Sequence, residues 1–334
     1  MSEPILQCKN LKKYFDTPRG KLHAVDDVSF SIDAGKTLGI VGESGCGKST
    51  LGRTILRLLP ATSGEVLFEG KNILQCSKKE SVALRQEMQI VFQDPYASLD
   101  PRKTVFQTIE EPLRFHKMYS SSEEVEARTY ELMKTVGLTE RYASMYPHEM
   151  DGGRRQRIGI ARALALNPKF IVCDEPVSAL DVSIQAQVLN LLMDLQDQMG
   201  LTYMFITHNL SVVKHISDEI GVMYLGQMIE RASSRELFAH PAHPYTKALL
   251  AAIPIPALGQ HNLESEALTG ELSSPVDPKP GCRFAPRCPY ACDLCRTQGP
   301  ASANMGGTHE VRCFAAQGAF PCETLKEVIR IGRE

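Results

Sequence analysis

The chain has 334 residues and a formal net charge of −2, which allows one large domain or two modest ones and leaves no basic surplus for binding nucleic acid. No apolar run approaches the roughly 18–20 residues that a membrane-spanning helix needs, and the first residues lack the positive start and apolar core of a signal peptide. We therefore expect a protein that is soluble by itself and cytosolic.

The first predicted elements are strands that lead into a glycine-rich loop. Strands are predicted at residues 5–10, 24–32 and 37–41. Residues 42–50 read Gly-Glu-Ser-Gly-Cys-Gly-Lys-Ser-Thr and fit the phosphate-loop pattern G-x-x-x-x-G-K-[ST] without a mismatch. Residues 51–59 have helical apolar spacing, so the loop lies between a strand end and a helix start.

This loop predicts a site for a nucleoside triphosphate and Mg²⁺. Its glycines let backbone N–H groups turn inward around phosphate oxygens, and the following helix adds positive potential at its N-terminus. Lys48 would reach the β- and γ-phosphates, and Ser49 would ligate Mg²⁺. A chance glycine-rich turn is the alternative, and the order of strand, loop and helix argues against it. The predicted nucleotide contacts of the loop are Gly42, Ser44, Gly45, Cys46, Gly47, Lys48, Ser49 and Thr50.

The middle of the chain is predicted to change from strands to helices. Residues 64–74 look like a hairpin strand, and residues 88–92 form another short strand. Residues 104–166 read mainly helical. A helix start is predicted at residues 120–123, where serines precede acidic residues of the first turn.

Two adjacent acids follow the next predicted strand. Residues 169–173 form a short apolar strand that ends in Asp174 and Glu175, and Pro176 turns the backbone. In an NTPase of this type, the first acid holds Mg²⁺, directly or through water, and the second polarises the attacking water. An apolar strand that ends in Asp-Glu is common, so it is the phosphate loop that gives this pair its functional interpretation.

The pattern of alternating strands and helices continues and then stops. Residues 182–199 have helical periodicity and residues 201–207 form a buried strand, so we predict an α/β fold with a mostly parallel sheet covered on both faces. Residues 256–281 are rich in Pro, Gly and Ser and read as a linker. Cysteines crowd the end of the chain and suggest a separate C-terminal module: Cys282, Cys288, Cys292, Cys295, Cys313 and Cys322.

The chain resembles the nucleotide-binding subunits of ABC transporters, a family of P-loop NTPases, over roughly residues 5–240. The matches to the family's Q-loop, signature, D-loop and switch histidine are residues 91–95, 151–157, 178–181 and His208. The family fold has a RecA-like core with a parallel sheet, an antiparallel β subdomain and a helical signature subdomain. The resemblance implies an ABC nucleotide-binding domain over residues 1–240, with its helical subdomain at about 95–165, and a C-terminal extension over residues 241–334.

The resemblance also implies which residues bind and hydrolyse ATP. Gln93 would meet Mg²⁺ and the attacking water, and His208 would contact the γ-phosphate. Phe15 sits where the family stacks an aromatic ring on adenine, with Tyr14 as the runner-up, although an aromatic so near the N-terminus is more often plain core. The implied catalytic residues are Lys48, Gln93, Glu175 and His208, the implied Mg²⁺ ligands are Ser49, Gln93 and Asp174, and the further implied nucleotide contacts are Asp151, Gly152, Gly153 and Asp181.

Within this family the chain is most similar to the oligopeptide and dipeptide importers. Residues 42–49, 92–101 and 241–246 and the cysteine-rich tail are typical of that branch. The resemblance implies a peripheral protein at the cytoplasmic face of the cell membrane. Its implied partners are two permease subunits, a second ATPase subunit and an extracellular or periplasmic substrate-binding protein.

The tail resembles that of the peptide-importer ATPases, where such cysteines can hold a [4Fe–4S] cluster. The implied ligands are Cys282, Cys288, Cys295 and Cys313, in a segment at about 282–313. Four thiolates suit either an iron–sulfur cluster or tetrahedral Zn²⁺, and the spacing does not choose between them. Cys292-x2-Cys295 is a spacing that zinc sites favour, His309 is a spare candidate ligand, and a tail without metal is the third alternative.

The signature departs from the family pattern. It normally reads Leu-Ser-Gly-Gly-Gln, and here residues 150–154 read Met-Asp-Gly-Gly-Arg. In the closed family dimer each ATP lies between the phosphate loop of one subunit and the signature of the other. The charge of Asp151 would face the γ-phosphate there, and Arg154 would offset part of it, although Asp151 could simply cap its helix. We therefore predict an asymmetric heterodimer in which this chain offers the weakened signature.

Three other functions compete with a peptide importer. An importer of nickel or another small solute would use the same motifs. A soluble ABC ATPase of translation or DNA repair would have two cassettes or a long coiled-coil insertion, and the interval from Ser49 to Asp151 has no room for the latter. A metal-sensing regulator that hydrolyses ATP incidentally would not need Glu175.

Overall fold

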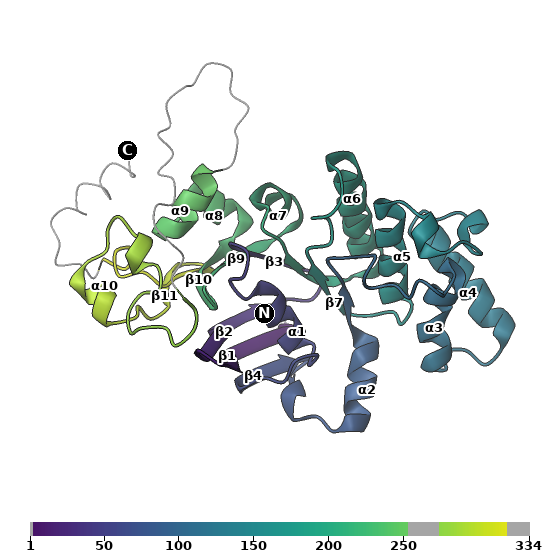
Figure 1. The fold of residues 1–334 in the computed structure, drawn as a ribbon, viewed down its shortest axis with the longest axis horizontal. Helices are drawn as coiled ribbons and strands as arrows, with labels where there is room; N and C mark the ends of the chain where they lie inside the picture. Colours follow the sequence, from purple (N-terminus) through teal and green to yellow (C-terminus); the bar gives the residue numbers. More distant parts are fainter. Residues whose placement is uncertain (1–2, 253–273, 319–334) are drawn as a thin grey trace, which may run out of the picture.

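The structure, a computed structural model, describes residues 3–252 and 274–318 (Figure 1). Among these residues, a large eight-stranded sheet has the order β11-β12-β10-β9-β3-β8-β7-β6. From β6 to β9 neighbouring strands are parallel, and β10, β12 and β11 continue the sheet with antiparallel pairing. Its strands are β3 (Thr37–Val41), β6 (Met88–Val91), β7 (Phe170–Asp174), β8 (Thr202–Ile206), β9 (Glu219–Tyr224), β10 (Gln227–Ser233), β11 (Ala303–Gly306) and β12 (His309–Val311).

A smaller antiparallel sheet packs beside the large one. Its order is β2-β1-β4-β5, and its strands are β1 (Leu6–Thr17), β2 (Gly20–Ile32), β4 (Ser63–Phe68) and β5 (Lys71–Asn72). Helix α1 (Lys48–Ile55) contacts β1 and β2 of this sheet and β7 and β8 of the large one. The helix that carries Lys48 and Ser49 is thus held between the two sheets.

The helices divide into a group over the large sheet and a group at one end of the molecule. Figure 1 shows α6 to α9 on the side of the large sheet opposite the smaller sheet, and α3, α4 and α5 together at the end away from the C-terminal segment. The helices other than α1 are α2 (Lys78–Glu87), α3 (Val105–Phe115), α4 (Ser122–Thr135), α5 (Gly152–Leu164), α6 (Val182–Met199), α7 (Leu210–Ile216), α8 (Ser234–Ala239), α9 (Pro244–Ala251) and α10 (Asp293–Thr297).

Most predicted elements are confirmed, with local differences. The helix at 182–199 and the cap at Ser121 agree with the prediction, and β1 and β2 extend further than predicted to meet at a tight turn. The helix predicted at 51–59 ends at Ile55, because Arg57 adopts a left-handed backbone with φ of 56°. Helix α2 was not predicted, although Ser77 and Glu80 form a capping box at its start.

The cysteine-rich segment is not a separate module, contrary to our expectation. Strand β12 pairs with β10 and so extends the large sheet, and Phe284 is buried beside Tyr224 and Tyr245 in one apolar cluster. Of the predicted linker, residues 253–273 lie outside the described residues, whereas Pro275 and its neighbours lie against β2 through a hydrogen bond from His23 N to Pro275 O at 3.0 Å. The boundary at residues 240 and 241 stays a prediction.

Candidate active site

The phosphate loop runs from the end of β3 to the start of α1 and is closely packed. Gly47 has φ of 103°, and a Cβ at this position would lie 2.0 Å from the carbonyl oxygen of Ala24, so only glycine fits. Nζ of the buried Lys48 donates to the carbonyl oxygens of Gly42 at 2.8 Å and Glu43 at 2.9 Å. The lysine therefore lies folded along its own loop, within reach of the loop's concave side.

A cavity of about 590 Å³ opens in front of this loop. It brings together side chains from the first strand, the phosphate loop, the Q-loop, the end of β7 and the end of β8. Its lining includes most of the predicted site residues: Phe15, Ser44, Gly45, Gly47, Lys48, Ser49, Thr50, Gln93, Glu175 and His208. A cavity lined by loop N–H groups, one lysine and hydroxyls suits a polyphosphate.

Asp174 lies behind Ser49, at the end of β7. Ser49 Oγ donates to Asp174 Oδ1 at 2.6 Å, and Arg53 Nη2 lies 3.3 Å from Asp174 Oδ2. Asp174 is fully buried. A hydroxyl and a carboxylate are the oxygen ligands that Mg²⁺ prefers, so this pair fits an Mg²⁺ site beside the loop.

Glu175 turns toward the cavity just beyond β7. Its backbone adopts φ of 47°, so its side chain points in a different direction from that of Asp174. Its Oε2 accepts a hydrogen bond from Gln93 Nε2 at 3.0 Å and lies 3.3 Å from His208 Nδ1. Three predicted catalytic side chains from three different loops thus meet at one carboxylate oxygen.

Phe15 and Tyr14 are neighbours on β1 but have different surroundings. Phe15 lines the cavity, and Lys13 Nζ lies 4.5 Å from the centre of its ring. Tyr14 stacks on His23 with ring centres 3.9 Å apart and donates its hydroxyl hydrogen to Asp26. The geometry therefore favours Phe15 over Tyr14 as the aromatic wall of the cavity.

Comparisons with known proteins agree with this geometry. The family model described as ABC transporter matches residues 25–178, and the model described as oligopeptide/dipeptide transporter, C-terminal region, matches residues 229–295. The oligopeptide transport ATP-binding protein AppF of Bacillus subtilis is 51% identical over 320 residues, which cover 93% of this chain and 97% of that protein. This chain is an ABC transporter ATPase.

Further relatives extend this similarity. The dipeptide transport ATP-binding protein DppF of Haemophilus influenzae is 48% identical over 93% of this chain and 96% of that protein. The dimeric ATP-binding cassette MJ0796 bound to ADP and Pi superposes with a TM-score of 0.64 at 31% identity, over 69% of this ATPase and 99% of that chain. The ABC fold is thus confirmed. Within the described residues, no helix is long and apolar enough to cross a membrane.

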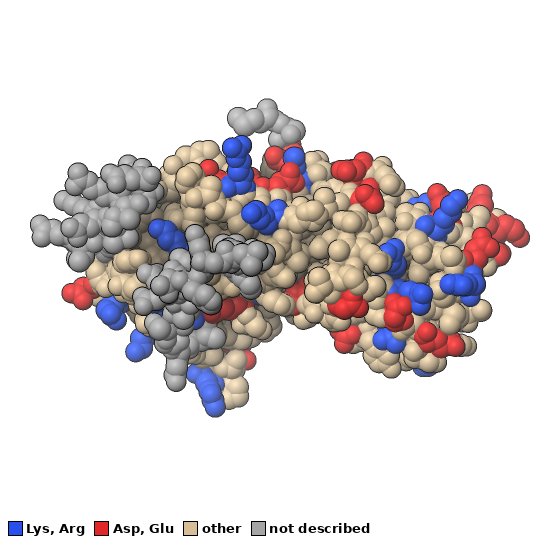
Figure 2. Space-filling model, turned by 90° about the horizontal axis from the view of Figure 1, so that it is seen from above, with Lys and Arg blue, Asp and Glu red and all other residues tan. Residues whose placement is uncertain are grey.

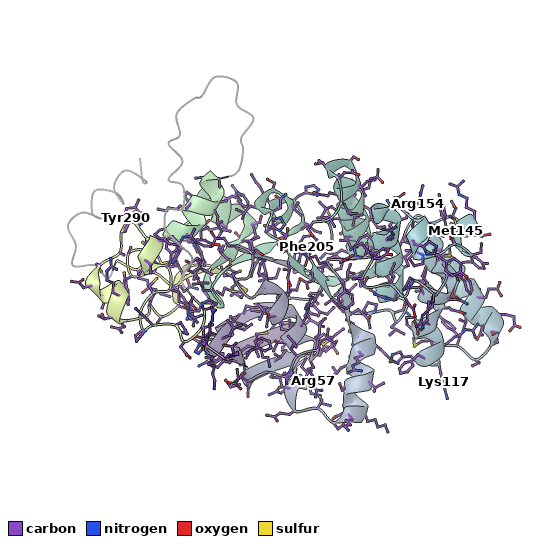
Figure 3. All side chains as sticks on the ribbon, in the orientation of Figure 1. Arg57, Lys117, Met145, Arg154, Phe205 and Tyr290 are labelled. Carbon is purple, nitrogen blue, oxygen red and sulfur yellow. The ribbon has the colours of Figure 1, made fainter. Side chains whose placement is uncertain are left out.

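The signature of the ATPase lies away from its own cavity, on the group of helices at one end. Arg154, within the signature, and Tyr290, on the C-terminal segment, lie at opposite ends of the molecule (Figure 3). Asp151 caps α5: its Oδ1 accepts from Arg154 N at 2.8 Å, and its Oδ2 pairs with Arg154 Nη1 at 2.7 Å. Asp151 therefore caps the helix, and Arg154 pairs with its carboxylate charge, as predicted.

The D-loop packs directly on the signature. A Cβ on Gly153 would lie 2.5 Å from Ile184 Cγ2, so glycine allows close approach there, and one on Gly152 would lie 3.0 Å from Leu180 Cδ2, a tight contact. Asp181 caps α6 by accepting from Ile184 N at 3.0 Å. The predicted nucleotide and cofactor contacts that do not line the ATPase's own cavity are Gly42, Cys46, Asp151, Gly152, Gly153, Asp174 and Asp181.

The cysteine-rich tail forms a second, smaller hollow. Cys282, Cys288, Cys295 and Cys313 line one narrow apolar cavity, and burial raises the pKa of Cys282 to about 11 and that of Cys288 to about 12. In the described part of the chain, no three His, Cys, Asp or Glu side chains are arranged to hold a metal ion. The thiols thus share a cavity but do not fit a metal site as they stand.

His309 is not a spare metal ligand. Its Nε2 lies 2.9 Å from Glu230 Oε1, and both side chains are buried. Glu230 also accepts from the backbone N–H groups of Ala242 and His243 at 2.6 and 2.9 Å. The histidine therefore belongs to a network that fixes the turn before α9.

Two residues of the C-terminal segment reach the phosphate loop, and the sequence analysis did not identify them. Tyr245 Oη accepts from Glu43 N at 3.0 Å, and Arg287 forms two hydrogen bonds with the Glu43 carboxylate. Tyr245 belongs to the motif at 241–246, which indicated the branch of the family but no role. Arg287 had no local signal.

Proposed function

We propose that this ATPase is the motor subunit of a membrane importer for oligopeptides or dipeptides. The observation that carries the proposal is the match of one chain to both an ABC transporter model and an oligopeptide/dipeptide transporter C-terminal model. Relatives named as oligopeptide and dipeptide transport ATP-binding proteins, which align over nearly the whole chain, support it. Positive and negative side chains are intermixed on the face in Figure 2, which gives no basic footprint for nucleic acid there.

We propose the following roles for the residues around the cavity. The phosphate-loop N–H groups and Lys48 bind the β- and γ-phosphates of ATP, and Phe15 stacks on adenine. Ser49, Asp174 and Gln93 hold Mg²⁺, which neutralises phosphate charge when it is bound. Glu175 orients and polarises the attacking water, and His208 contacts the γ-phosphate, because both point to the same place in front of the loop.

The partners follow from the same proposal. The ATPase would lie at the cytoplasmic face of the membrane, bound to two permease subunits and a second ATPase subunit, with an external substrate-binding protein. ATP binding would favour the closed pair of ATPase subunits, and hydrolysis would reopen it. Dimeric cassettes among the similar structures support the pairing.

We further propose that the pair is an asymmetric heterodimer. Asp151 presents a carboxylate where a hydroxyl would donate to the partner's γ-phosphate, and Arg154 is already bound to it. The ATPase's own Lys48, Glu175 and His208 would form the productive site with a partner that carries a standard signature.

The function is tested by peptide uptake in cells that carry Lys48→Ala. We expect uptake of a labelled dipeptide or tripeptide to stop while the complex still assembles, as judged by copurification with the permease subunits. Intact uptake would contradict the motor role. Loss of nickel uptake instead of peptide uptake would show that nickel is the substrate. Failure to copurify with any permease would indicate a soluble ATPase.

We also propose that the cysteine cavity takes up a metal, with a [4Fe–4S] cluster first and Zn²⁺ second. The support is that four thiols from the implied set line one cavity, although they must move closer to ligate. Iron and zinc analysis of anaerobically purified protein tests this. A brown protein that bleaches with dithionite indicates the cluster, and a colourless zinc protein indicates Zn²⁺. A purified protein that contains neither iron nor zinc would contradict the proposal.

A further inference from the structure

Glu43, in the phosphate loop, is held on three sides. Its backbone N–H donates to Tyr245 Oη at 3.0 Å, and its carbonyl oxygen accepts from Lys48 Nζ at 2.9 Å. Its carboxylate binds Arg287 Nη1 at 2.9 Å and Nη2 at 3.1 Å. Two of these three partners come from the segment that follows the cassette, so the C-terminal extension contacts the loop that faces the triphosphate.

The contact between Arg287 and Glu43 is a shielded, two-point ion pair. The Arg287 side chain is 6% exposed and that of Glu43 is 24% exposed. Parallel hydrogen bonds from a planar guanidinium fix the direction of a carboxylate as well as its place. The hydrogen bond to Glu43 raises the pKa of Arg287, so the guanidinium keeps its charge at any physiological pH.

Tyr245 is fixed just as firmly. It is fully buried and packs against Tyr224 and Phe284, with ring centres 4.8 and 5.5 Å apart. His243, two residues earlier, caps the same helix by accepting from Tyr245 N at 3.0 Å. The hydroxyl that holds the Glu43 N–H therefore belongs to a rigid part of the extension.

We propose that Tyr245 and Arg287 are positioning residues of the ATP site, through which the C-terminal extension sets the shape and charge of the phosphate loop. The inference rests on the proposed nucleotide site but goes beyond it, because neither residue lines the nucleotide cavity. Tyr245 keeps the start of the loop in the shape that its N–H groups need. Arg287 cancels a carboxylate that would otherwise repel the triphosphate.

The experiment measures the affinity of the purified full-length ATPase for Mg·ATP by calorimetry. Arg287→Gln leaves Glu43 unpaired, so we expect affinity to fall about five- to tenfold. The double variant Glu43→Gln/Arg287→Gln should recover most of this loss, because the repelling charge is gone. Tyr245→Phe removes one hydroxyl, and we expect a loss of about two- to fourfold.

Matched controls separate positioning from general stability. Arg296→Gln removes an exposed arginine from the same segment, and Tyr203→Phe removes a buried hydroxyl that donates to Leu192 O at 3.0 Å away from the cavity. Both controls should keep the wild-type affinity, even where Tyr203→Phe lowers the melting temperature as much as Tyr245→Phe does.

The outcomes are distinct. Wild-type affinity in both Arg287→Gln and Tyr245→Phe overturns the inference, and so does a double variant that binds no better than Arg287→Gln alone. If Arg287→Gln does not fold, the Mg·ATP affinity of Tyr245→Phe is compared with that of Tyr203→Phe. Equal affinities would then overturn the inference. A wild-type protein that does not bind Mg·ATP would instead contradict the nucleotide site itself.

Discussion

The hydroxyl of Ser49 donates to Asp174 Oδ1 across 2.6 Å and so ties the first turn of α1 to the end of β7. On its other oxygen, the buried Asp174 is paired with Arg53. The two proposed Mg²⁺ ligands therefore lie side by side. The site needs little rearrangement of these two side chains to accept the ion.

Asp174→Asn should weaken Mg²⁺ binding while the protein still folds. The amide keeps the hydrogen bond to Ser49 but is a poorer ligand than a carboxylate, so we expect the Mg²⁺ concentration for half-maximal ATPase activity to rise about ten- to a hundredfold. A titration of ATPase activity with Mg²⁺ measures this, with Asp194→Asn, an exposed position on α6, as the control. An unchanged midpoint would remove Asp174 from the Mg²⁺ site.

Glu175→Gln should stop hydrolysis and leave binding. Glutamine has nearly the shape of glutamate but cannot polarise water as a base, and loss of such a group costs about 10²–10⁴-fold in rate. We expect the kcat of the assembled complex to fall by that factor while Mg·ATP still binds. A variant with near wild-type turnover would show that another group activates the water.

Asp151→Ser tests the asymmetric dimer. Serine also caps a helix, so the free energy of unfolding should change by no more than about 1 kcal/mol with the loss of the exposed pair to Arg154. The ATPase activity of the assembled complex should stay the same or rise, because a hydroxyl replaces a repelling charge. Asp197→Ser, an exposed position on α6, is the control. If Asp151→Ser abolishes turnover, the weakened-signature proposal is wrong.

His243 should make the protein sensitive to mild acid. Burial lowers the pKa of His243 to about 4, and its Nδ1 accepts from Tyr245 N, so the folded state needs the neutral ring. The unfolded chain takes up a proton below about pH 6.5, and this histidine therefore costs stability as the pH falls from about 6.5 to about 4, by up to about 3 kcal/mol. Stability measured against pH should show a shallower fall in His243→Asn, which caps without titrating.

The pH experiment needs a control histidine, and His309 contributes to stability with the opposite sign. His215→Asn, an exposed position on α7, should leave the pH dependence as in the wild type. The pKa of His309 is raised by its hydrogen bond to Glu230, so its contribution has the opposite sign and is lost as the pH rises. Equal pH slopes in the wild type and His243→Asn would contradict the assignment.

Many residues that line the cavity could be recognised in the sequence, because they lie in short motifs at the ends of strands. Strands β3, β6, β7 and β8 have at or just after their ends residues 42–50, Gln93, the pair Asp174 and Glu175, and His208, and parallel strands bring their carboxyl ends to one edge. A local sequence pattern was enough for these residues, because the parallel sheet brings the ends of its strands together.

The remaining features depend on contacts between distant residues. Tyr245 and Arg287 are 202 and 244 residues from Glu43, and no periodicity or motif relates them to it. The same holds for β12, whose pairing with β10 made the cysteine-rich segment part of the sheet rather than a module of its own. Such relationships follow from tertiary packing, which a single sequence does not reveal.

The 244-residue separation between Glu43 and Arg287 also bears on synthesis of the protein. A ribosome completes the phosphate loop early, yet the arginine that neutralises it emerges only when most of the chain has been translated. A nascent chain therefore carries the unpaired Glu43 carboxylate until Arg287 has been made. Full capacity for ATP would then wait for the segment that carries Arg287, so that products terminated before it compete poorly for nucleotide.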